Sequence, residues 1–477
     1  MIGRRLILTK LLLELYLCTA QVIPREFQKQ QQQQTPNHWA IIVSGSKDIW
    51  NYRHQAGACH AYQLLTENGG IPKEQVIHFS FDDVSRHREN PFKGELFNKP
   101  NGPNVYEGCS IDYREKDVTP EKFIKALTGN KEMENQGNKV LKSNRESKVF
   151  IYLANHGAHG LLAFPQLDYL FADEFVEALK LMKDKGLYGE MVIYMEGSNS
   201  ASIFEDLLPE DIKIYSLSAA GPKETAFATY CYPNDLVKGG EHIGTCLGDL
   251  FTANFIEDSE KSDLEKETLS MQFKKVRANS KAFQTVTQHG DTSFTNEAIS
   301  NFLTNSHKSA ETYPLEPPPY SLSILHQLLH PFQTPYSPEL HSFNRHASAI
   351  NARDTKIHYL MSRITMLRAK QNPDESDMIR LHKLSLALTM ELHRRMRVDH
   401  VFEEFVAKGD RDTTTYIPPK NFKCLKRLME VYERSCGNKM DEYELQYTNL
   451  FVQECEKLPV PSAIDALVHR LQKACGH

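Results

Sequence analysis

Between residues 38 and 220 the chain alternates short apolar runs with amphipathic stretches, and this alternation restricts the folds that it can adopt. Five runs are rich in β-branched and aromatic residues and have the length of strands. Helical patterns lie between them. Strands that alternate with helices form βαβ units, so the sequence predicts an α/β domain with a mostly parallel sheet flanked by helices. The strand-like runs are HWAIIVSGS (38–46), QVIHFSF (75–81), SKVFIYLANHG (147–157), EMVIYMEGS (190–198) and DIKIYSLSAA (211–220), and the helical patterns are 53–69, 119–129 and 172–186.

The remainder of the chain has a different character. The polar stretch 130–148 has no clear periodicity and is interpreted as a surface loop. Prolines punctuate 311–351, which is typical of an exposed connector. Helical patterns then run through 352–477. The α/β domain is therefore expected to span 37–310, with an all-α module after the connector.

The beginning of the chain predicts export rather than a membrane anchor. Arg4 and Arg5 precede an apolar stretch that ends in small residues, so 1–20 is interpreted as a secretory signal peptide. Glutamines dominate 21–36, which is expected to be disordered. No other run is long enough to span a bilayer, and no membrane span is expected after signal removal. The net charge of −5 favours no nucleic-acid partner.

Cysteines concentrate near the carboxyl end. Removal of the signal peptide would leave eight of the nine cysteines, and four of these lie in the last 54 residues. In an oxidising compartment this pattern predicts two disulfides, for which three pairings are open. No motif indicates a metal site or a cofactor. The four residues are Cys424, Cys436, Cys455 and Cys475.

Two of the strand-like runs end in residues that can carry chemistry. His156 and Gly157 follow one run, and Ser198 follows a later one. Parallel strands present such residues at the carboxyl edge of the sheet. If the two strands are neighbours, an imidazole base and a hydroxyl face one crevice, with the Gly157 N–H as an oxyanion donor. Taken alone, both motifs also fit ordinary turns.

Longer motifs resemble the legumain family, the asparaginyl endopeptidases of the caspase-like clan of cysteine proteases. The block IWNYRHQAGACHAYQ (49–63) is close to identical to the family's, and 82–108 also follows the family pattern. DYREKDVTPEKF, KVFIYLANHGAHG and CLGD match as well. The resemblance covers nearly the whole chain. It implies a caspase-like fold followed by an all-α, disulfide-stapled prodomain.

The resemblance also implies roles for individual residues. His156 matches the catalytic histidine, Gly157 the oxyanion donor and Asn51 the residue that orients the histidine. Four further positions match the pocket for the asparagine side chain of a substrate. A carboxamide offers one acceptor and two donors, so a cation and carboxylates together satisfy it. The pocket positions are Arg53, His54, Glu196 and Asp249.

The chain departs from the family around the nucleophile. Ser198 stands where the family has its catalytic cysteine, and Asn155, Ala201 and Ala226 replace an acidic residue, a glycine and a serine. A serine hydroxyl is a far weaker acid than a thiol and needs a well-aligned base. Loss of a nucleophile costs on the order of 10⁶ in rate in a well-dissected hydrolase. Peptidase activity is therefore expected to be lost or strongly reduced.

No other cysteine follows the strand that should carry the nucleophile. Cys59 lies within a helical pattern and is interpreted as a buried structural thiol. Cys231 and Cys246 could pair with each other. The cysteine pairs that the resemblance implies are Cys424–Cys455 and Cys436–Cys475 in a prodomain that caps the site.

In the family, the cap is released at acidic pH after cleavage beside an asparagine. Asn351 falls at the expected place, although it also fits a helix cap. Without a thiol, a separate active protease would have to make the cut. The family acts in acidic compartments, so a lysosomal or vacuolar location, or secretion, is expected.

Three functions follow from these observations. The first is a legumain-like protein that recognises asparagine in peptides but has lost most peptidase activity. The second is a working asparagine-specific endopeptidase of vacuolar or lysosomal protein degradation. The third is a relative of the transamidase that attaches lipid anchors, which is disfavoured because that enzyme ends in a membrane helix.

Overall fold

The computed structural model describes residues 37–304, 349–406, 416–458 and 463–476. The expected signal peptide, the glutamine-rich segment and most of the proline-rich connector lie outside these residues. Among the described residues, no helix has both the length and the apolar character needed to cross a membrane.

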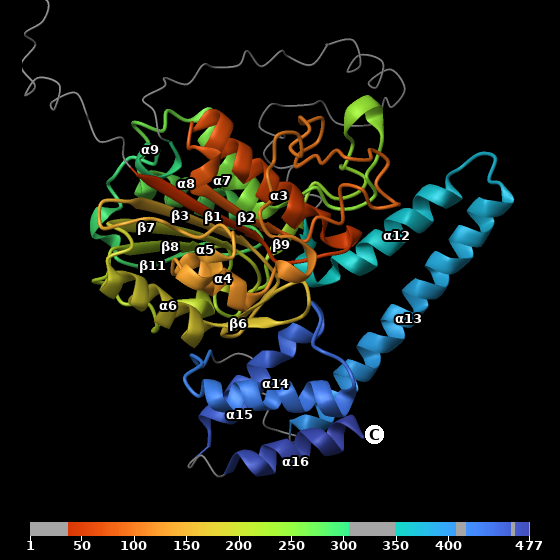
Figure 1. The fold of residues 1–477 in the computed structure, drawn as a ribbon. Helices are drawn as coiled ribbons and strands as arrows, with labels where there is room; N and C mark the ends of the chain where they lie inside the picture. Colours follow the sequence, from red (N-terminus) through yellow and green to blue (C-terminus); the bar gives the residue numbers. More distant parts are fainter. Residues whose placement is uncertain (1–36, 305–348, 407–415, 459–462, 477) are drawn as a thin grey trace, which may run out of the picture. The chain divides into compact units, whose positions relative to one another are not determined.

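A six-stranded sheet forms the centre of the α/β region, in the order β11-β8-β7-β3-β1-β2 (Figure 1). Five of its strands are parallel, and β11 pairs antiparallel with β8 at one edge. These five parallel strands correspond to the five predicted runs, so the predicted mostly parallel sheet is confirmed. The strands are β1 (His38–Ser44), β2 (Val76–Ser80), β3 (Lys148–Ala154), β7 (Glu190–Glu196), β8 (Ile214–Ser218) and β11 (Thr287–Gly290).

Helices cover both faces of the sheet because successive strand side chains point to opposite sides. On one face, alternate residues of β1, β3 and β7 pack with α4 (Pro120–Leu127) and α6 (Ala172–Lys185). On the other face, the intervening residues pack with α3 (Tyr52–Gln63), α7 (Leu250–Lys261) and α8 (Leu269–Ser280). Both faces are therefore dry, which explains why the strands read as continuous apolar runs.

Local sequence signals set the helix ends. Thr119 caps α4 by accepting a hydrogen bond from the Lys122 N–H, and Pro120 occupies the first helical position. The predicted loop 130–148 is corrected in one place. Asn130 caps a short helix, α5 (Lys131–Asn135), and this helix buries Met133. A five-residue polar helix has too few turns to produce a visible periodicity.

The C-terminal region is helical, as expected. After the short strand β12 (Ile350–Asn351), the helices α12 to α16 follow. Disulfides join Cys424 to Cys455 and Cys436 to Cys475, which are the pairs that the resemblance implies. The helices are α12 (Thr355–Arg368), α13 (Glu375–Phe405), α14 (Phe422–Cys436), α15 (Thr448–Glu456) and α16 (Ile464–Cys475).

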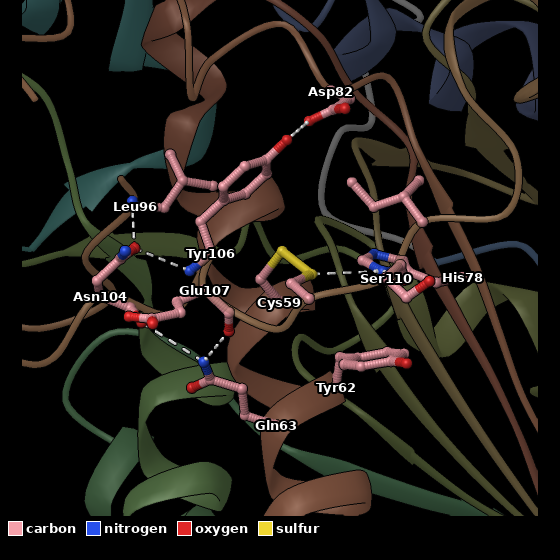
Figure 2. Close-up of a disulfide and its surroundings, with 12 residues drawn as sticks. Cys59, Tyr62, Gln63, His78, Asp82, Leu96, Asn104, Tyr106, Glu107 and Ser110 are labelled. Carbon is pink, nitrogen blue, oxygen red and sulfur yellow. Dashed lines mark hydrogen bonds between the residues drawn. A yellow bond between two sulfur atoms is a disulfide. The ribbon is translucent and has the colours of Figure 1, made fainter. Parts of the chain in front are cut away.

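The α/β region contains two further disulfides. Cys59, in α3, is bonded to Cys109, and His78 Nδ1 lies 3.7 Å from the Cys109 sulfur (Figure 2). The expectation of a free buried thiol at Cys59 is therefore wrong. Cys231 and Cys246 also form a disulfide.

Candidate active site

Strands β3 and β7 are neighbours and end together at the carboxyl edge of the sheet. Ala154 pairs with Glu196, so His156 and Ser198 both lie just beyond the paired ends. The backbone segments that follow the two strands approach closely here, since a Cβ on Gly157 would lie 2.1 Å from the Ser198 carbonyl oxygen. Only glycine fits at position 157 without a shift of the backbone.

Asn51 orients the imidazole of His156. The Oδ1 atom of Asn51 lies 2.9 Å from His156 Nε2, and Asn51 Nδ2 donates to the Lys47 carbonyl at 3.0 Å. An amide oxygen only accepts hydrogen bonds, so the proton of the neutral ring resides on Nε2. The lone pair on His156 Nδ1 is then free to accept a proton.

The His156 imidazole is held in its neutral form. Burial within the surrounding chain lowers the pKa of His156 well below its usual value, and the positive charges of Arg53 and Arg353 lower it further. A neutral imidazole can act as a general base. It cannot stabilise a neighbouring thiolate or alkoxide by charge.

Ser198 is buried and its hydroxyl already has a partner. The Ala226 N–H donates to Ser198 Oγ at 3.0 Å. Among the described residues, no hydrogen bond joins Ser198 to His156. The next residue, Asn199, has a left-handed φ of 56° and precedes the short 3-10 helix Ser200–Ile203.

The positions predicted to form the asparagine pocket lie together beside this edge as a buried polar cluster. Arg53 Nε donates to Asp249 Oδ1 at 2.6 Å, and Glu196 Oε2 accepts hydrogen bonds from the Thr252 N–H and hydroxyl at 3.1 Å each. Three buried polar atoms of the pocket have no hydrogen-bond partner among the described residues. They are Arg53 Nη2, Glu196 Oε1 and Asp249 Oδ2.

His54 belongs to the same buried polar cluster. Its Nδ1 lies 2.7 Å from Ser46 Oγ, and its Nε2 lies 3.7 Å from Asp249 Oδ2. Burial lowers the pKa of His54 well below its usual value, and Arg53 and His156 act in the same direction. His54 is therefore neutral and adds no charge to the pocket.

The two carboxyl groups of the pocket differ in their charge partners. Burial raises the pKa of Glu196 well above its usual value, and the nearby Asp249 raises it further. Burial also raises the pKa of Asp249, but the Arg53 guanidinium opposes this change. Glu196 therefore keeps its proton to a higher pH than an exposed carboxyl group does, whereas Asp249 forms an ion pair with Arg53.

The first residues after the connector lie against this edge of the sheet. In β12, Asn351 pairs with Phe227 of β9 (Phe227–Thr229), and the Ala352 N–H donates to the Ala226 carbonyl at 2.9 Å. The Asn351 side chain accepts a hydrogen bond from the Arg353 N–H at 2.9 Å. Asn351 is thus a helix cap, which is the alternative that its sequence context left open.

Arg353 inserts between the two strand ends. Its Nη2 donates to the Gly157 carbonyl at 3.0 Å and to Asn199 Oδ1 at 2.9 Å, while its Nη1 donates to the Glu442 carbonyl at 2.7 Å. Nearby, Arg53 Nη1 donates to Thr355 Oγ1 at 3.4 Å. The beginning of the C-terminal region therefore covers the site residues.

Comparison with known proteins matches residues 38–307 to the model of the peptidase C13 family. The chain belongs to the peptidase C13 family. The resemblance to legumain found in the sequence is thereby confirmed.

Several curated relatives match over most of their length. The chain is 31% identical to legumain from Canavalia ensiformis, over 87% of this chain and 84% of that protein. It is 32% identical to a vacuolar-processing enzyme from Phaseolus vulgaris, over 87% and 81% of the two chains, and 32% identical to hemoglobinase from Schistosoma japonicum, over 92% and 93%. The structure of caspase-1 from Spodoptera frugiperda covers 57% of this chain and 93% of its own, with 11% identity and a TM-score of 0.33.

Three contact residues of this peptidase C13 chain were missed by the sequence analysis. Thr252 binds Glu196, while Arg353 and Thr355 reach the site from the C-terminal region. Arg353 stands two residues after Asn351, and a charged residue beside an expected cleavage point was an available signal.

Two of the residues that differ from the family motif also form hydrogen bonds of their own. Asn155 Nδ2 donates to the Ala163 carbonyl at 2.9 Å, and the Ala201 N–H donates to the Ala220 carbonyl at 3.1 Å.

The cysteines of this peptidase C13 chain are all engaged within the described residues. The eight cysteines from Cys59 to Cys475 form four disulfides. The described part of the chain therefore contains an imidazole base and a buried polar cluster at the predicted pocket positions, but no free thiol near either.

Proposed function

We propose that the chain binds peptides through an asparagine side chain and has lost most or all of its peptidase activity. The observation that carries this proposal is the lack of a free thiol among the described residues, together with Ser198 at the end of β7. In this proposal His156, Gly157 and Asn51 are the remaining catalytic positions. Ser198 occupies the position of the nucleophile.

The hydroxyl environment supports the loss of activity. A serine nucleophile needs a base that removes its proton during attack, and the base usually has a carboxylate partner. His156 has the amide of Asn51 instead, and Ser198 Oγ is bonded by the Ala226 N–H. Proton removal from Ser198 would require a different rotamer of its side chain. The resulting imidazolium of His156 would also have no carboxylate partner to stabilise it.

The three unpartnered atoms of the pocket support asparagine recognition. Arg53 Nη2 can donate to a carboxamide oxygen, and Glu196 Oε1 and Asp249 Oδ2 can accept from a carboxamide NH₂. The two carboxyl groups also disfavour a ligand carboxylate, which would bring a further negative charge beside them. A site built on such hydrogen bonds rejects ligands that lack them, by roughly 10⁴-fold in favourable cases.

The proposal includes a cap and a compartment. The C-terminal region from residue 352 acts as a cap, since Arg353 and Thr355 contact site residues. A separate protease would cut beside Asn351, because the described residues contain no free thiol for self-cleavage. Relatives named vacuolar-processing enzymes and four disulfides favour a vacuolar, lysosomal or secretory location.

The second candidate is a working asparagine-specific endopeptidase that uses Ser198. The intact pair of His156 and Asn51 favours it, because the Nδ1 lone pair remains available as a base.

One assay separates the two candidates. The full chain is cut in the connector by an added protease at acidic pH, the C-terminal fragment is removed, and hydrolysis of a fluorogenic Ala-Ala-Asn peptide is measured beside a Ser198→Cys variant. We expect no turnover from the native chain and measurable turnover from Ser198→Cys. A Ser198→Cys/His156→Ala variant controls for contaminating protease. Comparable turnover of the native chain and Ser198→Cys would contradict the proposal.

Binding is tested separately from turnover. Peptides that differ only in Asn, Asp or Gln at one position are titrated by calorimetry against the cut native chain from which the C-terminal fragment has been removed. We expect measurable affinity for the Asn peptide alone. Equal affinity for all three peptides would contradict asparagine recognition and leave the loss of turnover standing.

A further inference from the structure

A histidine lies beside the disulfide that joins Cys59 to Cys109. Cys59 belongs to α3, His78 belongs to β2, and Cys109 lies in a later loop. One ligand atom from each of the three side chains lies within 4.8 Å of the other two, and His78 Nδ1 is 3.7 Å from the Cys109 sulfur (Figure 2). The three positions are far apart in the sequence, so no motif indicates this cluster and only the fold assembles it.

Two cysteine sulfurs and one imidazole nitrogen form a set of ligands that zinc prefers. Bond lengths of about 2.3 Å to sulfur and about 2.0 Å to nitrogen place the ligand atoms of a tetrahedral zinc ion about 3.4–3.8 Å apart. The separation between His78 Nδ1 and the Cys109 sulfur already lies in this range. The S–S bond is the obstacle, because bonded sulfurs carry no negative charge and cannot both bind one ion.

The imidazole of His78 is held in its neutral form, which is the form that binds metal ions. The pKa of His78 is lowered to about 4, chiefly by burial and also by the charges of Arg114 and Lys139. His78 Nδ1 donates to the Ser110 carbonyl at 3.0 Å, which partly opposes this shift. His78 Nε2 is buried and has no hydrogen-bond partner among the described residues. It can therefore carry the ring proton when a metal ion takes the place of the proton on Nδ1.

The cluster is rigid on one side and accessible on the other. Cys59 and His78 are buried in a helix and a strand, with exposed fractions of 1% and 0%. Cys109 is partly exposed and lies in a loop, so a small reagent can reach its sulfur and its side chain can move. Two ligands are thus fixed by regular elements, and the third can adjust its position to a metal ion.

We propose that reduction of the Cys59–Cys109 disulfide by a small thiol creates a zinc site, with the two thiolates and His78 Nδ1 as ligands. The thiolate of one small thiol attacks the Cys109 sulfur, and Cys59 leaves with the electron pair of the S–S bond and takes up a proton. A second small thiol attacks the sulfur of the first, and Cys109 leaves in the same way. The two small thiols end as one disulfide, and the chain has gained two electrons and two protons.

Zinc binding completes the change. One zinc ion replaces both thiol protons, which pass to the solvent, and its fourth position faces the exposed side at Cys109. Cys59 and Cys109 are then crosslinked in either redox state, by the disulfide or through the metal ion. The helix that carries Arg53 and His54 therefore keeps its crosslink in a reducing compartment. This proposal does not depend on the proposed function.

Zinc titration of the full chain tests the proposal. The chain is reduced with a phosphine, which adds no competing thiol, and mass spectrometry after alkylation confirms that Cys59 and Cys109 are free. The Kd for Zn²⁺ is then measured by competition with a chromogenic chelator. We expect one zinc ion to bind to the reduced chain about a hundredfold or more tightly than to the oxidised chain. Equal affinity in the two redox states would overturn the proposal.

Three reduced variants identify the ligands. Cys109→Ser retains the thiols released from the other three disulfides, and we expect it to lose the tight site. His78→Asn keeps an N–H for the Ser110 carbonyl but lacks the imidazole, so its Kd should rise about tenfold or more. His87→Asn changes a partly exposed histidine outside the cluster and is the matched control, which should bind zinc as the native chain does. Unchanged zinc affinity in Cys109→Ser or in His78→Asn would overturn the assigned ligands.

Cobalt spectra of the reduced native chain keep the proposal testable even where a variant loses stability. Co²⁺ accepts the same ligands as zinc, and thiolates give it an intense charge-transfer band in the near ultraviolet. We expect this band, and we expect zinc to raise the Tm of the reduced chain. Circular dichroism before metal addition checks that the reduced chain is folded. A reduced chain that is unfolded before the metal is added, or one that is folded and gives no thiolate band, would overturn the proposal.

Discussion

The backbone of Ala226 links Ser198 to the C-terminal region. Its N–H donates to Ser198 Oγ at 3.0 Å, and its carbonyl accepts from the Ala352 N–H at 2.9 Å. The residue at the expected nucleophile position and the segment that covers the site are thus joined through one peptide unit. A change in either partner is expected to affect the other.

Removing the Ser198 hydroxyl is expected to lower stability. In Ser198→Ala the buried Ala226 N–H loses its acceptor, which costs about 1–3 kcal/mol. Urea unfolding measures this loss, and Ser376→Ala on the exposed surface of α13 serves as the control. An unchanged free energy of unfolding in Ser198→Ala would mean that this hydrogen bond contributes nothing.

Arg353→Ala is expected to open the site of the uncut chain. The substitution removes the hydrogen bonds to the carbonyls of Gly157 and Glu442 and to Asn199 Oδ1. Bonds from a charged donor are worth about 1.5–3 kcal/mol each, so an Asn peptide should bind about tenfold more tightly or better. The control is Arg363→Ala, which removes an ion pair with Glu89 instead. Equal peptide affinity in the two variants would argue against a cap function for Arg353.

The carboxyl group of Glu196 is expected to lower the stability of the folded chain as the pH rises. Because its pKa is raised in the folded chain, the folded state retains a proton that the unfolded state releases above about pH 4.5. Stability from this group is therefore full at lower pH and declines towards higher pH. Glu196→Gln, which stays neutral, should be stabilised relative to the native chain at pH 8 and much less so at pH 5. Urea unfolding at the two pH values measures the difference, and a gap that shrinks with rising pH would contradict this sign.

A second pH effect is expected within the C-terminal region. Burial and the neighbouring Asp441 raise the pKa of Glu442 to about 7, from a usual value of 4.5. The stability that Glu442 contributes is complete below about pH 4.5 and is lost as the pH rises through 7. This group stabilises the folded C-terminal region at acidic pH, which would oppose release of the proposed cap. In Glu442→Gln, thermal unfolding should depend less on pH between 5 and 8, and an unaltered pH profile would exclude Glu442 as the cause.

The Cys59–Cys109 disulfide is expected to stabilise the helix that carries the pocket. It closes a loop with a sequence separation of 50, for which chain entropy predicts a stabilisation of about 4 kcal/mol. Arg53 and His54 lie in the first turn of the same helix, α3. Cys109→Ser should therefore lower stability and weaken binding of an Asn peptide. Cys436→Ser in the C-terminal helices is the control, since it should lower stability without altering the affinity of the cut chain.

The sheet could be predicted because strands that are buried on both faces consist of continuous runs of apolar residues. The runs that became β3 and β7 are apolar between their terminal residues, and the polar residues that follow them indicated His156 and Ser198 as site residues. Contacts between residues that are distant in the sequence produce no such local pattern. The Arg53–Thr355 hydrogen bond joins positions 302 residues apart, and Cys59 finds Cys109 across a separation of 50. Tertiary geometry alone decides these pairs.

Because β12 pairs with β9, a cut in the connector would break the covalent link to the C-terminal region without removing that region from the site residues. Ile350 and Asn351 are bound as a strand, and Arg353 is anchored at the strand ends, by contacts that do not require the preceding chain. Severing the backbone upstream would therefore leave the fragment in place as a noncovalent plug. Cleavage of the backbone and departure of the fragment are therefore separate events, and only departure of the fragment would admit a competing peptide.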